Sequence, residues 1–215
     1  MNEKLQSKLH RIFAFCADGK SAGLVIPELA KRGAHIRGLL RKPDNQAKQP
    51  VEEAVLSSNM EFTFLHPAVF FQNLASSWPR VVESGVFAEP WSTETKFSRV
   101  DYRDVAKVAA LALTEDELVY GTFELCSEGY LNRKEVAAII SDLLGRPIKA
   151  EKLDPKVLGN EGQAAAMKPM FEWYDHHSLR GNPLILRTIL GDEPRTLKGF
   201  ISELADAIAI KTSNA

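Results

Sequence analysis

The chain has 215 residues, a formal net charge of −1 and only two cysteines, Cys16 and Cys126. This near-neutral charge gives no broad attraction to nucleic acid or to an anionic membrane surface, so we expect neither as a partner. No apolar run approaches the roughly 20 residues that span a bilayer, and two isolated thiols suit a reducing compartment. Composition therefore predicts an ordinary globular protein of the cytoplasm.

Short apolar runs alternate with helical stretches along the chain, which is typical of an α/β fold. The expected elements of the first third are strand 11–16, helix 20–31, strand 34–41, helix 50–58 and strand 61–65.

The later elements are shorter strands among helices. We expect helix 70–84 with a break at Trp78-Pro79, strands 86–89 and 96–100, helix 101–113, strand 120–126, helix 133–144, strand 148–153 and helices near 164–177, 183–190 and 196–210. Asn132 and Glu135 have the spacing of a capping box, and Gly145 is a stop signal for the helix that they open. The pattern predicts an α/β protein whose C-terminal part is mostly helical.

A glycine turn follows the first expected strand, at residues 16–23 (CADGKSAG). A strand that runs into such a turn and then a helix N-terminus is a ready site for a pyrophosphate. In a G-x-x-G-x-x-G pattern only Gly19 keeps its glycine, since Cys16 stands first and Ala22 third. An ordinary strand–turn–helix with an isolated glycine is the alternative interpretation.

The second expected strand ends on positive charge. Arg41 and Lys42 close it and Arg37 lies earlier along it, where a fold that prefers NAD usually carries an acidic residue. A guanidinium suits the 2′-phosphate of NADP, so we favour NADP over NAD. A solvated basic strand end is the alternative.

Four further blocks resemble the NmrA-like family, atypical relatives of the short-chain dehydrogenases/reductases. Residues 48–53 (KQPVEE) and 61–73 (EFTFLHPAVFFQN) are similar to that family's K-x-x-V-E … T-x-L-x-P-x-x-F-x-x-N block. Residues 99–106 (RVDYRDVA) look like its D-x-x-D-V-A helix start. Residues 121–136 resemble its late strand and helix, and 174–200 its C-terminal lid region. The order of the blocks is more specific than any one of them.

The resemblance implies a Rossmann-like NAD(P)-binding region over residues 1–113 and a substrate-side α/β region over 114–215. Some members of the family reduce quinones or related small carbonyl compounds with NADPH by hydride transfer. Others bind the nucleotide without turnover and act as redox-sensing regulators. The implied partners are therefore a nucleotide cofactor and a small-molecule substrate.

The resemblance also implies roles for single residues. Arg41, with Arg37 nearby, would meet the adenosine 2′-phosphate, and Lys48 matches the family lysine near the nicotinamide ribose, which makes it the catalytic candidate. The residues that would meet the pyrophosphate are Cys16, Asp18, Gly19, Lys20 and Ala22. The residues whose backbone would lie beside the nicotinamide are His66, Pro67, Ala68 and Val69.

The chain departs from the family between Arg41 and Lys48, where six residues replace three strands with their helices and loops. One βαβ unit alone takes about 30 residues, so the parallel sheet is predicted to be incomplete. We assign the third strand to the far side of the sheet, which leaves the first strand with an exposed edge or a new pairing. An exposed edge favours a homo-oligomer. We expect weak or absent NADP(H) binding and inefficient turnover, and an inactive shortened product is a further alternative.

Other chemistry-bearing residues have simpler interpretations. Residues 175–177 (DHH) superficially offer metal ligands, but neighbouring histidines rarely converge on one ion, so a surface patch at a helix end is favoured. Trp78, Trp91 and Trp173 are expected in packing, with Trp91 alternatively lining a substrate pocket.

Overall fold

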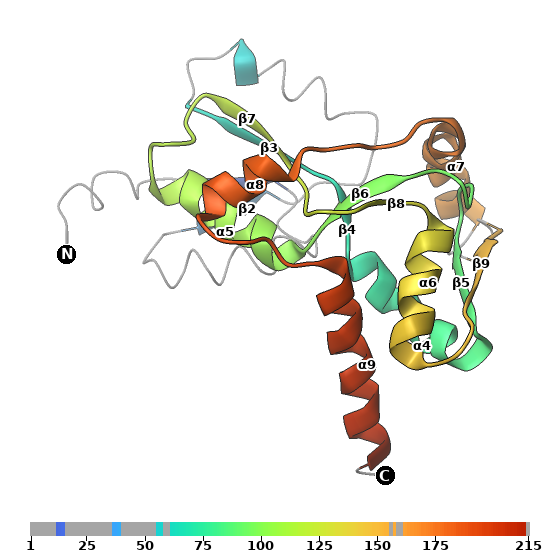
Figure 1. Cartoon of the computed structure of the whole chain (residues 1–215). Coiled ribbons are helices and arrows are strands. Elements are labelled where there is room, and N and C mark those ends of the chain that lie inside the picture. Colours follow the sequence, from blue (N-terminus) through green and yellow to red (C-terminus); the bar gives the residue numbers. More distant parts are fainter. Residues whose placement is uncertain are drawn as a thin grey trace. The chain divides into compact units, whose positions relative to one another are not determined.

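The computed structural model describes residues 12–15, 36–39, 55–57, 61–154, 157 and 161–213 (Figure 1). The described residues group into two compact units. The first unit draws on the ranges 1–67, 102–125 and 184–193, and the second on 68–101, 126–183 and 194–215. The functional division at residue 113 concerns the roles of the two regions and stays a prediction.

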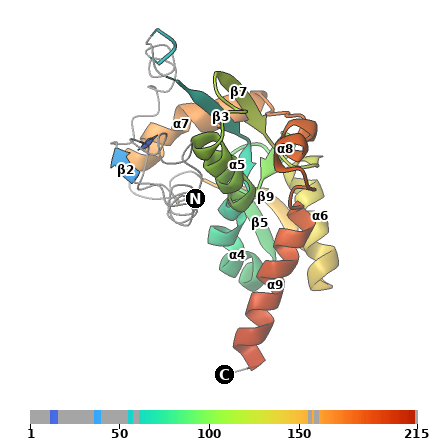
Figure 2. The same cartoon turned by 90° about the vertical axis from the view of Figure 1, so that its left-hand side faces the viewer.

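The first unit contains two pairs of parallel strands. β1 (Ile12–Phe15) pairs with β2 (Ile36–Leu39), and β3 (Thr63–Pro67) pairs with β7 (Gly121–Leu125). Figure 2 shows β3 and β7 side by side, and α5 (Tyr102–Thr114) contacts β3. Among the described strands β3 therefore pairs with a late strand and not with β1, as our assignment to the far side of the sheet requires. Parallel pairs of this kind need crossover connections, which is the α/β pattern expected from the sequence.

The second unit contains two further small sheets. β4 (Val69–Phe70) pairs in parallel with β6 (Phe97–Val100), and β6 pairs antiparallel with β8 (Tyr130–Leu131). β5 (Val86–Glu89) pairs in parallel with β9 (Lys149–Lys152). Strand β4 is short, but the backbone N–H of Phe71 extends its attachment to β6 by donating to Val100 O at 2.9 Å.

Helices α4 (Gln72–Ser84), α6 (Arg133–Leu144) and α9 (Leu197–Ser213) pack with β5 and β9 into the main core of this unit (Figure 1). Trp78 is 3% exposed, and its indole Nε1–H donates to Leu204 O at 3.1 Å. This confirms the packing role predicted for that tryptophan. The buried residues of the core are Phe71, Leu74, Trp78, Val81, Phe87, Val136, Ala137, Ile140, Ile148, Leu197, Phe200 and Ile201. Among the helices that the structure describes, none has the length and apolar character needed to cross a bilayer.

The ends of α6 confirm the predicted signals. Asn132 Oδ1 accepts a hydrogen bond from Glu135 N at 2.9 Å, and Glu135 Oε2 accepts one from Asn132 N at 2.7 Å. Gly145 ends the helix with a φ of 62°, a left-handed conformation that costs a residue with a Cβ extra energy.

The predicted break at Trp78-Pro79 is wrong, because α4 runs through Pro79 without interruption. A proline inside a helix costs about 3 kcal/mol, through a lost hydrogen bond and a clash. Trp78 and Val81 lie on the same buried side of α4, and burying two such side chains gains a similar amount. Tertiary packing therefore outweighs the local signal.

Candidate functional site

The structure describes some of the residues that were predicted to contact the nucleotide and not others. Arg37 lies in β2 opposite Phe13 of β1, which places its backbone in the parallel pair. The segment from His66 to Val69 is described in full. The predicted residues that lie outside the described ones are Cys16, Asp18, Gly19, Lys20, Ala22, Arg41 and Lys48.

The end of β3 carries the first two residues of the predicted nicotinamide segment. His66 pairs with Glu124 and Pro67 with Leu125, both on β7, so the backbone here belongs to a parallel ladder. His66 is exposed and Pro67 is half-buried. The main chain is thus ordered up to the carboxyl end of the strand, the end at which ligands bind in open parallel sheets.

Val69, the last residue of that segment, is held on a different sheet. It lies opposite Arg99 in the β4–β6 pair, and its side chain packs on a cluster of buried aromatic residues. Its backbone position is therefore fixed by a ladder, and its side-chain position by aromatic packing.

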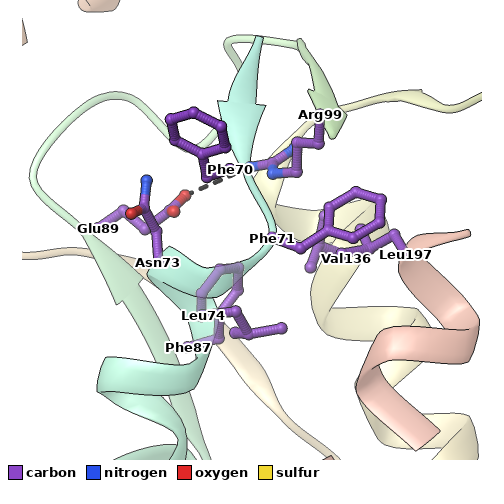
Figure 3. Close-up of a pocket in the computed structure, with 9 residues that line it drawn as sticks. All are labelled: Phe70, Phe71, Asn73, Leu74, Phe87, Glu89, Arg99, Val136 and Leu197. Carbon is purple, nitrogen blue, oxygen red and sulfur yellow. Dashed lines mark ion pairs between the residues drawn. The ribbon is translucent and has the colours of Figure 1, made fainter. Parts of the chain in front are cut away.

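A small cavity lies between β4, α4 and β6 (Figure 3). Its volume is about 10 Å³, the size of one water molecule, so it admits neither a nicotinamide ring nor a substrate. Figure 3 shows Phe70 and Asn73 on either side of the ion pair between Glu89 and Arg99. The lining residues are Phe70, Phe71, Asn73, Leu74, Phe87, Glu89, Arg99, Val136 and Leu197.

The polar wall of this cavity belongs to a buried charge cluster. Glu89 Oε2 lies 3.5 Å from Arg99 Nη2 and 3.4 Å from Arg133 Nε, so two guanidinium groups share one carboxylate. The side chains of Glu89, Arg99 and Arg133 are only 12%, 7% and 1% exposed. Burial lowers the pKa of both arginines, and the Glu89 carboxylate opposes that shift. Ions buried this deeply are tolerated only when they are paired and hydrogen-bonded.

Backbone carbonyls supply the remaining hydrogen bonds of the cluster. Arg99 Nη1 donates to Leu131 O at 3.1 Å, and Arg133 Nη1 donates to Glu151 O at 2.8 Å. Arg133 Nη2 is buried, and no residue that the structure describes accepts a hydrogen bond from it. The cluster therefore ties β5, β6, β8, β9 and the start of α6 together around the Glu89 side chain.

Sequence reasoning missed this cluster. Its only sequence signal is that Glu89 and Arg99 are charged residues within short apolar strands, VFAE and FSRV. A charge inside an apolar strand predicts a buried partner, but it does not say which one.

Four aromatic rings form a second cluster beside β6. The ring centroid of Trp91 lies 5.6 Å from that of Phe97, 6.0 Å from that of Phe171 and 5.5 Å from that of Tyr174. The guanidinium of Arg133 lies 5.6 Å from the Trp91 ring, within the range of a cation–π contact. Trp91 is 7% exposed and packed, so its predicted packing role is confirmed.

Helix α7 (Glu161–His176) contributes Phe171 and Tyr174 and is fastened at its C-terminal end. Asp175 Oδ1 accepts a hydrogen bond from Ser92 N at 2.6 Å, and Asp175 Oδ2 lies 2.5 Å from Lys152 Nζ. Leu179, just beyond the helix, accepts a hydrogen bond from Ser98 N at 2.8 Å. Loop 90–96 and α7 are thereby held together on one side of β6.

Asp175 and His177 therefore have local partners of their own. His177 stacks on Trp173 with ring centroids 4.6 Å apart, and both histidines are exposed. In the part of the chain that the structure describes, no three His, Cys, Asp or Glu side chains come together as metal ligands. Trp173 is 45% exposed, so its predicted role in packing is wrong.

Comparison with known proteins identifies the family. The family model of the NmrA-like family matches residues 45–205, which is more than half of the chain. The chain belongs to the NmrA-like family. The His66–Val69 segment, the buried charge cluster and the aromatic cluster all lie within the matched residues.

Two curated relatives are reductases. An NAD(P)H azoreductase of Xenophilus azovorans is 36% identical over 98 residues, which are 46% of this chain and 34% of the relative. A (4-alkanoyl-5-oxo-2,5-dihydrofuran-3-yl)methyl phosphate reductase of Streptomyces griseus is 32% identical over 102 residues, 47% of this chain and 36% of the relative. The chain spans about a third of the length of these relatives.

Solved structures establish the fold. An NADPH-dependent quinone oxidoreductase of Escherichia coli matches with a TM-score of 0.72 at 17% identity, covering 90% of this chain and 99% of the other. The triphenylmethane reductase of Citrobacter sp., complexed with NADP(H), matches with a TM-score of 0.63 at 16% identity, covering 94% and 79%. The α/β fold of this NmrA-like chain is thus similar to that of Rossmann-like NAD(P)-binding reductases, as the sequence predicts.

Proposed function

We propose that this NmrA-like protein is an NADPH-linked oxidoreductase that transfers hydride to a quinone or a related small carbonyl compound. The observation that carries the proposal is the family match over residues 45–205, since it includes the whole predicted nicotinamide segment. The reductase names of the relatives support the same reaction class.

The residues proposed to hold the cofactor are consistent with the described strands. Because β1 and β2 run parallel, their carboxyl ends lie at one edge of the pair, where the loop that contains Gly19 and the end that carries Arg41 are expected to meet the nucleotide. Arg37 and Arg41 would bind the 2′-phosphate and Lys48 the nicotinamide ribose. The His66–Val69 backbone would orient the nicotinamide, the group that supplies the hydride when bound.

We further propose that cofactor binding is weak and turnover slow. Only six residues separate Arg41 from Lys48, where the family resemblance places three strands and their covering loops. Shortening of this kind removes contacts to adenine and nicotinamide and leaves no tyrosine to partner Lys48 as proton donor. The same observation favours a second candidate function, a nucleotide-sensing protein that binds without turnover. A cytoplasmic location, and a homo-oligomer formed through a strand edge, stay predictions.

Two measurements on the purified chain test these proposals. NADPH oxidation followed at 340 nm with a panel of quinones detects turnover, and the change in NADPH fluorescence on titration gives the affinity. We expect affinity weaker than micromolar, reduced about tenfold or more by Arg41→Ala because a charge-assisted contact to the 2′-phosphate is lost. A matched Arg32→Ala variant, at the expected end of the first helix, controls for the loss of one positive charge.

The outcomes separate the candidates. Quinone-dependent oxidation that needs Lys48 supports the reductase, whereas NADPH binding without turnover supports the sensor. Micromolar NADPH affinity would contradict the proposed weakening. No binding and no turnover up to millimolar NADPH would leave the inactive product as the description of this chain.

A further inference from the structure

The outward side of α6 and the loop that follows it form an open groove, the α6 groove, with a volume of about 710 Å³. The helix packs on β5, β9 and α9 through its opposite side (Figure 1). Lys134, Ala138 and Asp142 line the groove, and all three are exposed. They are spaced four residues apart, so they form one stripe along the helix. The groove is wide open and does not enclose a small molecule, so it suits the surface of another protein.

The two ends of the α6 groove each carry one positive and one negative side chain. At the start of the helix, Lys134 Nζ lies 2.6 Å from Glu94 Oε1, and these side chains are 62% and 64% exposed. Beyond the other end, Arg146 follows Asp142 by four residues, and both are exposed and line the groove. Ala138 stands midway between Lys134 and Asp142. The order along the groove is therefore negative, positive, alanine, negative, positive.

This order of charges is its own complement when it is reversed. If a second copy lies antiparallel across α6 with Ala138 at the crossing, Lys134 faces Asp142 of the second copy. Glu94 then faces Arg146 of the second copy, and the two-fold axis makes each contact twice, as in an isologous dimer. The short side chain of Ala138 lets the two helices approach closely, and their antiparallel dipoles attract.

We propose that two copies of this chain associate weakly through the α6 groove, with Ala138 on a two-fold axis and Lys134 of each copy paired with Asp142 of the other. The charges of Glu94, Lys134, Asp142 and Arg146 sum to zero, so they favour neither an acidic nor a basic partner. They do match a second copy of themselves. This inference goes beyond the proposed reductase function and does not depend on it.

The size of the contact indicates a transient dimer. Helix α6 has 12 residues and is therefore about 18 Å long, which places the contact at the small end of specific interfaces. Exposed ion pairs each contribute little, so the affinity stays low. The α6 groove belongs to the second unit, whereas the strand edge predicted to favour a homo-oligomer belongs to the first. Substitutions in the groove therefore distinguish the two modes of association.

The test is sedimentation velocity on the full chain without nucleotide, at rising protein concentration up to the solubility limit. We expect a monomer–dimer equilibrium that stops at the dimer and weakens as salt is added, because the pairs are exposed. Lys134→Glu and Asp142→Lys each place like charges opposite one another twice, so each should weaken the dimer about tenfold or more. Lys168→Glu is the matched control, since Lys168 is equally exposed and pairs with Glu172 on α7, and it should dimerise as the native chain does.

Two further variants test the symmetry of the contact. The double variant, Lys134→Glu with Asp142→Lys, restores opposite charges across the axis and should recover the dimer, whereas independent damage at two sites would add. A residue on a two-fold axis meets its own copy, so Ala138→Cys chains should become a disulfide-linked dimer with oxidised glutathione. Lys168→Cys chains, treated in the same way, give the background of random collision.

Several results would overturn the inference. These are a chain that stays monomeric up to its solubility limit, a dimer that Lys134→Glu leaves unchanged, and a double variant that binds no tighter than the single ones. Larger assemblies that are insensitive to these substitutions would assign association to the strand edge and overturn it as well. NADPH binding and oxidation are measured separately, so failure of the dimer leaves the proposed function standing, and failure of turnover leaves the dimer standing.

Discussion

Replacing Glu89 with glutamine is the sharpest perturbation of the second unit. The change keeps the shape of the side chain and removes the one carboxylate that Arg99 and Arg133 share at 3.5 and 3.4 Å. Both guanidinium groups are then buried without that counter-charge. Breaking a buried ion pair by removing one partner costs about 3–5 kcal/mol, and the loss of one carboxylate shared by two buried guanidinium groups places this variant at the upper end.

The assay is urea unfolding followed by circular dichroism, with thermal melting as a second measurement. Each kcal/mol shifts the melting temperature of a chain of this size by roughly 2–4 °C, so we expect Glu89→Gln to melt on the order of 10 °C lower. Glu94→Gln is the matched control, because the Glu94–Lys134 pair is 64% and 62% exposed and should contribute nothing measurable.

Arg133→Met tests whether the two guanidinium groups carry more positive charge than the Glu89 carboxylate balances. This variant leaves Glu89 and Arg99 as a one-to-one pair and removes the buried Nη2, which has no acceptor among the described residues. We therefore expect Arg133→Met to destabilise less than Glu89→Gln, and the double variant to recover part of the Glu89→Gln loss. A Glu89→Gln loss below about 1 kcal/mol, or a larger loss for Arg133→Met, would refute the reasoning.

Three smaller effects concern the ends of α6 and are measured by the same unfolding assay. Asn132→Ala removes the cap that bonds Glu135 N at 2.9 Å and is expected to cost about 1 kcal/mol, whereas Asn132→Asp should cost far less. Gly145→Ala forces a Cβ into a backbone with φ of 62° and is expected to cost about 1 kcal/mol through backbone strain, since no described residue beyond the local chain comes within 4 Å of that Cβ. Gly145→Asn should cost less. The Lys96 and Asn132 hydrogen bonds lower the pKa of Glu135, so its stabilisation is complete above the ordinary glutamate pKa of about 4.3 and is lost as pH falls through the lower folded value. The difference in unfolding free energy between the native chain and Glu135→Gln should therefore shrink between pH 5 and pH 3, and a constant difference would contradict the assignment.

Local signals in the sequence were sufficient to predict the bounds of elements that have clear start or stop residues. The bounds of α6 follow from Asn132, Glu135 and Gly145, and those of β5 from a short apolar run before Pro90. Local signals failed where tertiary packing decides. The burial of Trp78 carries α4 through Pro79, and nothing in the chain near Trp173 indicates that its ring faces solvent beside His177.

Sequence reasoning reached only those parts of the candidate site that are continuous in the chain. A continuous motif carries the His66–Val69 segment, whose role beside the nicotinamide stays a prediction. The Glu89–Arg99–Arg133 cluster could not, since its members are brought together by three separate elements across 44 residues. The same holds for the contact of Val69 with the aromatic cluster, which joins β4 to a helix about 100 residues later.

The membership of the main core has a consequence for how this protein tolerates change. Among the described residues, the buried members of this core run from Phe71 to Ile148 and from Leu197 to Ile201, and none of them is a residue proposed to hold the cofactor. Substitutions in this core are therefore expected to lower the stability of the second unit while leaving the proposed cofactor contacts in place.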